Sequence, residues 1–245
     1  MMDLLFLRFD APMVSFGGVA VDNLGVVQAY PALSLLTGLC ANALGYGHAE
    51  FQAHQDLQRR LCYSVRCDRN GDPLQDYQTV DLGQNFMVDT GWTTQGKPQG
   101  REGGKSSKAT HIRYMDYRAD SIHSLALGLD PADHGPTLHD LECALREPAR
   151  PLFLGRKCCL PAAPILLGRL QAEDLHAALV CMPLAAPTRR DRGPSYRAWW
   201  PEGHGAGQRG RRLMVSDARD WANSIHVGQR MVIEGEVTIR EDCNA

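Results

Sequence analysis

The first half of the chain alternates between strand-like and helix-like hydrophobic patterns. Residues 4–9 form a short apolar run that ends in a turn sequence, which predicts a central strand followed by a loop. Residues 31–45 carry apolar side chains at helical spacing between Pro31, which a helix accepts in its first turn, and Gly45, which ends one. A second helix is predicted over about 49–61 and a strand over 63–67, with a returning strand over 75–80 after the turn cluster at 70–73.

The periodicity disappears between residues 80 and 109, where glycines alternate with Lys97, Arg101, Lys105 and Lys108. A loop of this length inside a domain is usually functional or disordered. Strand-like patterns return at 111–117 and 121–129, separated by residues 118–120. We therefore predict an extended β-hairpin, or thumb, rooted in a sheet.

The second half is less regular. It contains a predicted helix over 137–146 with Thr137 as its N-cap, a short helix over 173–182 and a closing strand over 231–239. Between them, residues 189–212 form a second basic concentration, rich in arginine and glycine. We expect Trp199 and Trp200, inside this stretch, to belong to a core or interface rather than to a platform for bases.

These patterns favour an α+β fold of ferredoxin-like (RRM-like) type. We expect this domain over residues 1–147, with the thumb inserted at about 80–112. A smaller C-terminal region over 148–245 follows, with an Arg/Gly-rich loop at about 187–212. The uncharged stretch at 23–49 exceeds the length of a membrane span, but polar residues and glycines interrupt it, so a buried helix is predicted and no membrane association.

Composition narrows the function classes. The 245 residues have 44% hydrophobic side chains and a formal charge of −2, as expected for a packed core. A polyanion site on such a chain must be concentrated in one region. The eight cysteines form no C-x-x-C pair and the N-terminus lacks a basic segment before its apolar run, so we expect no zinc site, no secretory signal, reduced thiols and a cytoplasmic location.

The glycine-rich basic segment suits a phosphodiester backbone, because lysine and arginine neutralise phosphates and glycines allow close approach of main-chain N–H groups. Nearby aromatic residues could stack unpaired bases; these are Phe86, Trp92, Tyr114 and Tyr117. The alternative is a solvated loop without a binding role. Lys108, His111 and Tyr114 also suggest a metal-independent ribonuclease, although in an alternating strand Tyr114 would point away from His111 and Arg113.

The sequence Phe-Leu-Gly-Arg-Lys-Cys-Cys at 153–159, followed by Pro164 to Gly168, resembles the CasD-like subunits of type I-E CRISPR Cascade complexes, which belong to the RAMP superfamily. It is the most specific of several matching segments. Others occur in the family's order and approximate spacing, at 7–13, 16–17, 30–31, 33–45, 65–68, 76–80 and 117–120. Together the matches cover most of residues 4–170. The family commonly has basic residues in the loop before the first helix and at its start, whereas residues 26–28 and 32–34 are uncharged here.

The resemblance implies a non-catalytic subunit without a cofactor or metal. Its partners would be the 5′ handle of the crRNA, the Cascade backbone subunit whose filament it caps, the large PAM-sensing subunit and, indirectly, target DNA. On this basis the predicted RNA-binding residues are Lys97, Arg101, Lys105, Lys108, His111, Arg113, Arg156 and Lys157.

Two other functions stay open. One is a metal-independent endoribonuclease that processes precursor crRNA, as in type I-C relatives, with Lys108, His111 and Tyr114 as its candidate residues. The other is a cap that contacts only proteins, whose basic residues would meet acidic partner surfaces. The first would cleave a repeat hairpin without metal, and the second would bind without the salt dependence of RNA contacts.

Overall fold

The computed structural model describes residues 1–18, 24–81, 91–92, 98–99, 110–184, 193–207 and 209–240. Four helices lie in these ranges, at Leu33–Leu44 (α1), Phe51–Arg60 (α2), Leu138–Arg146 (α3) and Leu175–Cys181 (α4). The longer strands are β1 Met2–Val14, β3 Leu61–Arg69, β4 Asp72–Asp81, β7 Thr110–Leu129, β8 Leu166–Ala172, β9 Tyr196–Pro201, β10 Arg211–Val215 and β13 Arg230–Val237. Short strands are β2 Leu24–Gly25, β5 Gly91–Trp92, β6 Pro98–Gln99, β11 Ala218–Asp220 and β12 Ile225–Val227.

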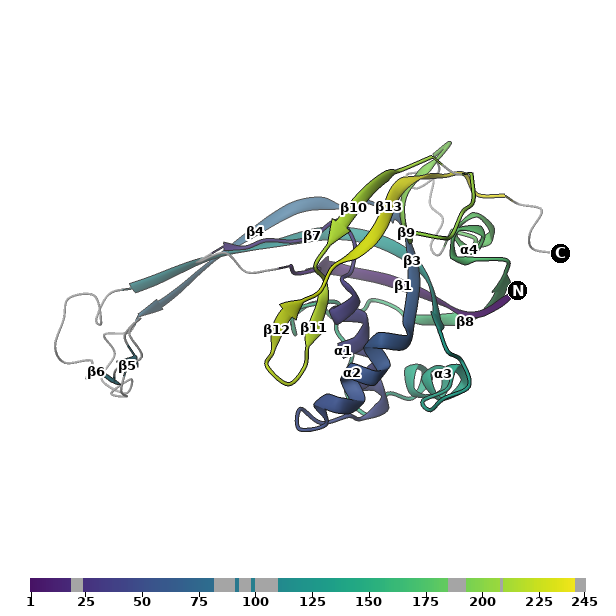
Figure 1. Ribbon diagram of the computed structural model, residues 1–245. Coiled ribbons are helices and arrows are strands. Elements are labelled where there is room, and N and C mark those ends of the chain that lie inside the picture. The colour runs from purple at the N-terminus through teal and green to yellow at the C-terminus, as the bar shows by residue number, and fades with distance from the viewer. Residues whose placement is uncertain are drawn as a thin grey trace.

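One large sheet organises the fold (Figure 1). Its described strands run in the order β10-β13-β9-β3-β7-β1-β8, while β2 and β4 also pair with β7. Neighbours are antiparallel except for the short β2–β7 contact. Strands from both sides of residue 147 share this sheet, because β8 pairs with β1 and β9 pairs with β3.

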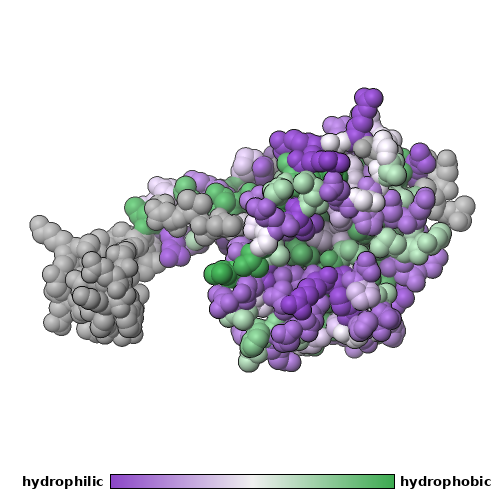
Figure 2. Space-filling model, viewed as in Figure 1, coloured by the Kyte–Doolittle hydropathy of each residue, from purple (hydrophilic) through white to green (hydrophobic). Residues whose placement is uncertain are grey.

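Each face of the sheet has its own core. Side chains alternate along β1, so Leu5 and Leu7 enter the cluster that contains Leu36 of α1, together with residues of α2 and α3. Leu4 points to the opposite face and joins the cluster of Leu179 on α4. The layers are therefore three helices, the sheet and the short helix α4. Figure 2 shows that hydrophilic residues predominate on the visible face of the body.

The predicted helices are confirmed where local signals mark their ends. Gly45 follows α1 with φ 86°, a left-handed conformation that glycine adopts without a steric penalty. Thr137 and Asp140 form a reciprocal capping box at the start of α3. Both signals lie within a few residues of the helix end, so they can be recognised in the sequence.

One predicted boundary is wrong. The separate strands expected at 111–117 and 121–129 form the single strand β7, although Asp120 has a positive φ of 54°. The first half of β7 pairs with β4, and the second half lies between β1 and β3. β7 pairs with β4 up to Ala119 and with β3 from Ile122 onward, while β1 pairs with it across the predicted break. The backbone therefore stays hydrogen-bonded through residues 118–120, and the strand does not end there. β1 is likewise longer than the expected run at 4–9.

The C-terminal basic stretch is also more ordered than predicted where it is described. β9 lies within it and β10 begins at its end, and Trp199 and Trp200 are each 2% exposed, which confirms their assignment to the core. β13 lies between β9 and β10 and brings Glu234 to Arg197 and Arg211, which both pair with it. Part of the positive charge expected to be available here is therefore neutralised within the chain.

The cysteines correct one further expectation. Cys181 is disulfide-bonded, so the prediction of reduced thiols is wrong at this position. Arg240 N donates to Val180 O at 3.0 Å, which brings the C-terminal segment beside the end of α4. Among the described cysteines, six are free. The helices in the described ranges are too short or too polar to cross a membrane, and the described histidine, cysteine, aspartate and glutamate side chains form no group suited to a metal ion.

Candidate nucleic-acid interface

A two-stranded arm projects from the body of the protein (Figure 1). It consists of β4 and the first half of β7, which pair from Asp72 opposite Ala119 to Asp81 opposite Thr110. This pair is the root of the predicted hairpin, and its outer ends flank the basic segment. The residues predicted there to bind phosphates, which are Lys97, Arg101, Lys105 and Lys108, lie outside the described residues.

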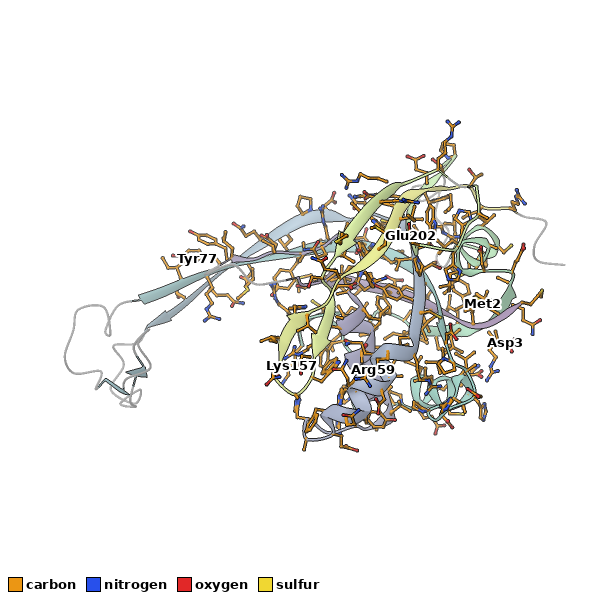
Figure 3. All side chains as sticks on the ribbon, in the orientation of Figure 1. Met2, Asp3, Arg59, Tyr77, Lys157 and Glu202 are labelled. Atoms are coloured by element: carbon orange, nitrogen blue, oxygen red, sulfur yellow. The ribbon has the colours of Figure 1, made fainter. Side chains whose placement is uncertain are left out.

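The arm carries an aromatic pair, of which one ring is exposed and the other partly buried. Tyr77 and Tyr114 lie opposite each other on β4 and β7, with ring centroids 5.5 Å apart and an interplanar angle of 63°. Tyr77 is 56% exposed, and Figure 3 shows it on the arm. An exposed ring on a paired strand can stack an unpaired base, at about 1–3 kcal/mol per base. Tyr114 was among the candidates from sequence, whereas Tyr77 was missed.

The opposite face of the arm carries Arg113, which is exposed and lies opposite Gln78. Because side chains alternate along a strand, Arg113 and Tyr114 point to different faces, as the sequence predicted. The backbone of His111 pairs with Val80, and its side chain lies outside the described residues. The structure thus brings Tyr114 to Tyr77 rather than to Arg113.

Arg156 has a structural position at the junction of arm and body. Its Nη1 donates to Asp116 O and its Nη2 to Gly25 O, both at 2.9 Å. The guanidinium also lies 4.6 Å from the centroid of the Tyr117 ring. A Cβ at Gly25 would come within 2.5 Å of Arg156 Nη2, so glycine leaves room for this contact. Arg156 therefore connects β2 and β7 to the loop that carries it.

The neighbouring Lys157 is exposed on the same loop. The loop is fixed by a bond from Leu154 N to Cys159 O at 2.8 Å and by one from Ser15 N to Leu154 O at 3.1 Å. Gly155 has φ 108°, and a Cβ there would lie only 1.9 Å from Ser15 O. This explains the glycine in the segment that most resembles the CasD-like subunits: it lets the loop close against β1 and present Lys157 to solvent.

The N-terminus of α1 is a possible phosphate site, because helix N-termini attract anions. Here it is occupied by a carboxylate of the chain itself: Asp217 Oδ2 accepts from Leu33 N at 3.0 Å, and Asp217 O accepts from Ser34 N at 2.9 Å. Asp217 also accepts two bonds from Arg230, at 2.6 and 2.8 Å. The uncharged loop before this helix and the internal carboxylate agree in leaving little attraction for phosphate.

A tyrosine completes this arrangement. Tyr63 OH donates to Pro31 O at 2.8 Å and accepts from Arg230 Nη2 at 2.6 Å. Burial raises the pKa of Tyr63 well above its usual value, so the hydroxyl stays protonated as a donor. The sequence did not indicate that Tyr63, Asp217 and Arg230 form one unit, because Tyr63 lies 154 positions from Asp217 and the three residues form no local pattern.

The fold resembles those of solved CRISPR-associated proteins. One chain of a structure described as "CRISPR RNA-guided surveillance complex" aligns over 98% of this chain and 92% of its own length, with a TM-score of 0.67 and 22% identity. A structure described as "Crystal structure of Cas protein" aligns over 98% and 96%, with a TM-score of 0.60 and 21% identity. At these identities the likeness shows the shared fold.

The family follows from the sequence comparison. The model of the family described as CRISPR-associated protein (Cas5), in its Cas5d form, matches residues 4–233. The chain therefore belongs to the CRISPR-associated Cas5 family. It is similar to the CRISPR system Cascade subunit CasD of Escherichia coli K12, with 28% identity over 189 residues that cover 74% of this chain and 77% of that protein. The resemblance seen over residues 4–170 is confirmed and extends further along the chain.

Proposed function

We propose that this chain is a non-catalytic subunit of a Cascade-type CRISPR ribonucleoprotein complex. In this role it binds the 5′ handle of the crRNA, caps the backbone filament and contacts the large PAM-sensing subunit, and it meets target DNA only indirectly. The observation that carries the proposal is family membership over residues 4–233, together with the similarity to CasD. The projecting arm supports it, because this extension of the sheet offers an exposed surface beyond the body of the protein.

The fold supports the finer assignment to a ferredoxin-like RAMP domain. β1, α1, β3, β7, α3 and β8 follow one another as strand, helix, strand, strand, helix, strand, apart from α2 and the arm. In space these four strands lie in the order β3-β7-β1-β8, with antiparallel neighbours. This is the arrangement of a β-α-β-β-α-β unit. We propose that this unit extends past residue 147 to Ala172, and that the remaining C-terminal strands enlarge its sheet.

RNA contacts in this proposal depend on charge and stacking rather than on catalysis. Lys97, Arg101, Lys105, Lys108 and His111 would follow the RNA backbone from the arm, and Arg113 and Lys157 would add charge from the described surface. Arg156 already donates to two carbonyls, so fewer of its donors remain for a phosphate. Its larger effect would be to hold the foot of the arm in place.

The decisive test is co-purification. A tagged full-length chain is co-expressed with the other Cascade subunits and a CRISPR array, and the bound RNA is sized. We expect a discrete guide-sized RNA and a backbone subunit present in several copies. If the assembled partners carry guide RNA but leave this chain behind, the proposal is wrong.

Charge substitutions in the basic segment test the RNA contact itself. Replacing Lys105 and Lys108 by alanine should weaken handle binding and flatten the slope of log affinity against log salt by about 0.7 per lost contact with single-stranded RNA. An unchanged slope would remove these lysines from the RNA path and favour the cap that contacts only proteins. The matched control is Arg59→Ala, since Arg59 is exposed on α2 and lies on the body of the protein, away from the arm (Figure 3).

A cleavage assay separates the proposal from the nuclease alternative. If the chain is non-catalytic, metal-free incubation of the purified chain with a repeat hairpin leaves the RNA intact. A single specific cut that His111→Ala abolishes would instead assign the chain to the precursor-processing class.

A further inference from the structure

A groove lies on the helical side of the protein, away from the aromatic pair on the arm. It has a volume of about 880 Å³ and is bordered by α1, by the segment that joins α1 to α2, by residues 150–157 and by Trp221. Its size is within the range of sites that hold small organic ligands. Among the proposed handle-binding residues that the structure describes, Lys157 lines this groove, whereas Arg113 and Arg156 do not.

The groove has aromatic walls. His54 lies between Tyr46 and Trp221, with ring centroids 5.9 Å and 4.7 Å away respectively. Trp221 is fixed by a bond from its Nε1 to Gln58 Oε1 at 3.2 Å. Phe153 lines the groove from the opposite loop and is half-buried. Tyr46, His54 and Trp221 are held by these contacts before any ligand arrives, so a planar group could bind beside them at low entropic cost.

The charge of the groove has one sign. Among the described residues that line it, the charged side chains are Arg150 and Lys157, both exposed and basic, and none is a carboxylate. Arg150 is preorganised: its Nη1 donates to Tyr46 O at 2.8 Å and its Nη2 to Gly45 O at 2.7 Å. These bonds also satisfy carbonyls at the end of α1, so the guanidinium offsets the negative end of that helix.

We infer that this groove binds one unpaired nucleotide of a single-stranded RNA, its base among Tyr46, Phe153 and Trp221 and its phosphate near Lys157, while Arg150, whose donors are engaged within the chain, adds positive charge nearby. This inference rests on the proposed function, which supplies the RNA. The combination of rings and cations favours a nucleotide over an acidic peptide, because a peptide carboxylate would meet the cations and leave the aromatic walls without a planar partner.

Two variants separate stacking from charge. Gly38 lies on α1 in the groove, and a Cβ there would be 3.5 Å from Trp221 Cη2, so Gly38→Leu fills the space for the base. Leucine is also a better helix former than glycine, which favours folding of the variant. Lys157→Ala removes a surface charge without altering the walls. Arg59→Ala is the control, because Arg59 lies on α2 outside the groove.

The probe is a fluorescein-labelled eight-nucleotide polyuridine, measured by anisotropy with the full-length chain. We expect Gly38→Leu to weaken binding by about tenfold, the effect of one lost base stack. Lys157→Ala should lower the salt slope by about 0.7. A version with 4-thiouridine should cross-link to Tyr46, Phe153 or Trp221.

Three outcomes would overturn the inference. If RNA binds but Gly38→Leu binds equally well and cross-links map only to the arm, the groove is not a nucleotide site and the proposed function stands. If polyglutamate displaces the probe as well as unlabelled polyuridine does, the groove recognises charge and not a base. If the chain takes up no RNA even within the assembled complex, the proposed function fails and this inference fails with it.

Discussion

A buried arginine joins the sheet to α4, and its replacement gives the most direct test of the packing described above. Arg66 is fully buried on β3. Its Nε donates to Asp68 Oδ1 at 2.6 Å, and its Nη1 donates to Leu179 O and Met182 O, each at 2.6 Å. Its Nη2 donates to Pro183 O at 2.9 Å. One side chain therefore holds a carboxylate and the end of α4 together.

The loss of stability expected for Arg66→Met follows from the buried polar groups that would lose Arg66 as their donor. Arg66→Met leaves the Asp68 carboxylate buried with Ser124 Oγ, at 2.6 Å, as a remaining donor. Breaking a buried ion pair costs about 3–5 kcal/mol, and the carbonyls at the end of α4 lose their donors as well. We expect a loss of about 4 kcal/mol, a large share of a typical total of about 5–15 kcal/mol.

The assay is urea unfolding of the wild type, Arg66→Met, Asp68→Leu and the double variant, followed by circular dichroism. The double variant should be more stable than Arg66→Met by at least about 1 kcal/mol, because it no longer buries the carboxylate that has lost its ion pair with Arg66. Arg59→Ala, which breaks an exposed pair with Asp56, should change stability by less than about 0.5 kcal/mol. A double variant no more stable than Arg66→Met would refute this account, as would a loss below about 1 kcal/mol in Arg66→Met.

Three further predictions concern other parts of the fold. Burial lowers the pKa of His123 to about 4. On acidification the unfolded chain therefore takes up a proton at this residue near pH 6.5, while the folded chain keeps it neutral until about pH 4. The free energy of unfolding should fall by up to about 3 kcal/mol as the pH is lowered from 6.5 to 4. His123→Phe should flatten this dependence in urea unfolding measured across that range, and an equally steep profile would contradict the reasoning. Asp217→Ala should lower the free energy of unfolding by about 2 kcal/mol, because it removes the acceptor at the start of α1 and the carboxylate that pairs with Arg230. Asp217→Asn should lose less, because the amide oxygen can still accept from Leu33 N. Equal losses of the two variants in thermal unfolding would show that the cap contributes little. Gly155→Ala should lower the free energy of unfolding by about 2 kcal/mol or more, because its Cβ would collide with Ser15 O. Gly168→Ala is the control, since a Cβ there meets nothing within 4 Å, and it should lose about 1 kcal/mol or less. Similar urea midpoints for the two variants would contradict the close approach to Ser15.

The predicted fold was most accurate where neighbours along the chain set the conformation. The helix at 137–146 was predicted because Thr137, a favoured N-cap residue, directly precedes apolar residues at helical spacing, and the structure confirms both the helix and its cap. β9 was missed because residues 189–212 show little periodicity, and its stability depends on pairing with β3 and β13. The Arg/Gly composition of that region carried no information about these partners.

The candidate site was predicted in part. Arg113, Tyr114, Arg156 and Lys157 were recognised from composition or resemblance, and the structure places the first two at the foot of the arm and the last two on one loop. Their different environments were not visible in the sequence. Whether an arginine faces solvent or donates to backbone carbonyls depends on which strand lies beside it, as Asp116 and Gly25 lie beside Arg156.

Local patterns alone were thus enough to indicate helices, turns, the hairpin root and the family, because each depends on residues close together in the chain or on short motifs. The strand order, the cap of α1 and the groove were decided only by the tertiary structure. Asp217 meets Leu33 across 184 positions, and Trp221 reaches the groove from the C-terminal part of the chain. Such contacts form when burial of two cores brings distant segments together, and no spacing in the sequence encodes them.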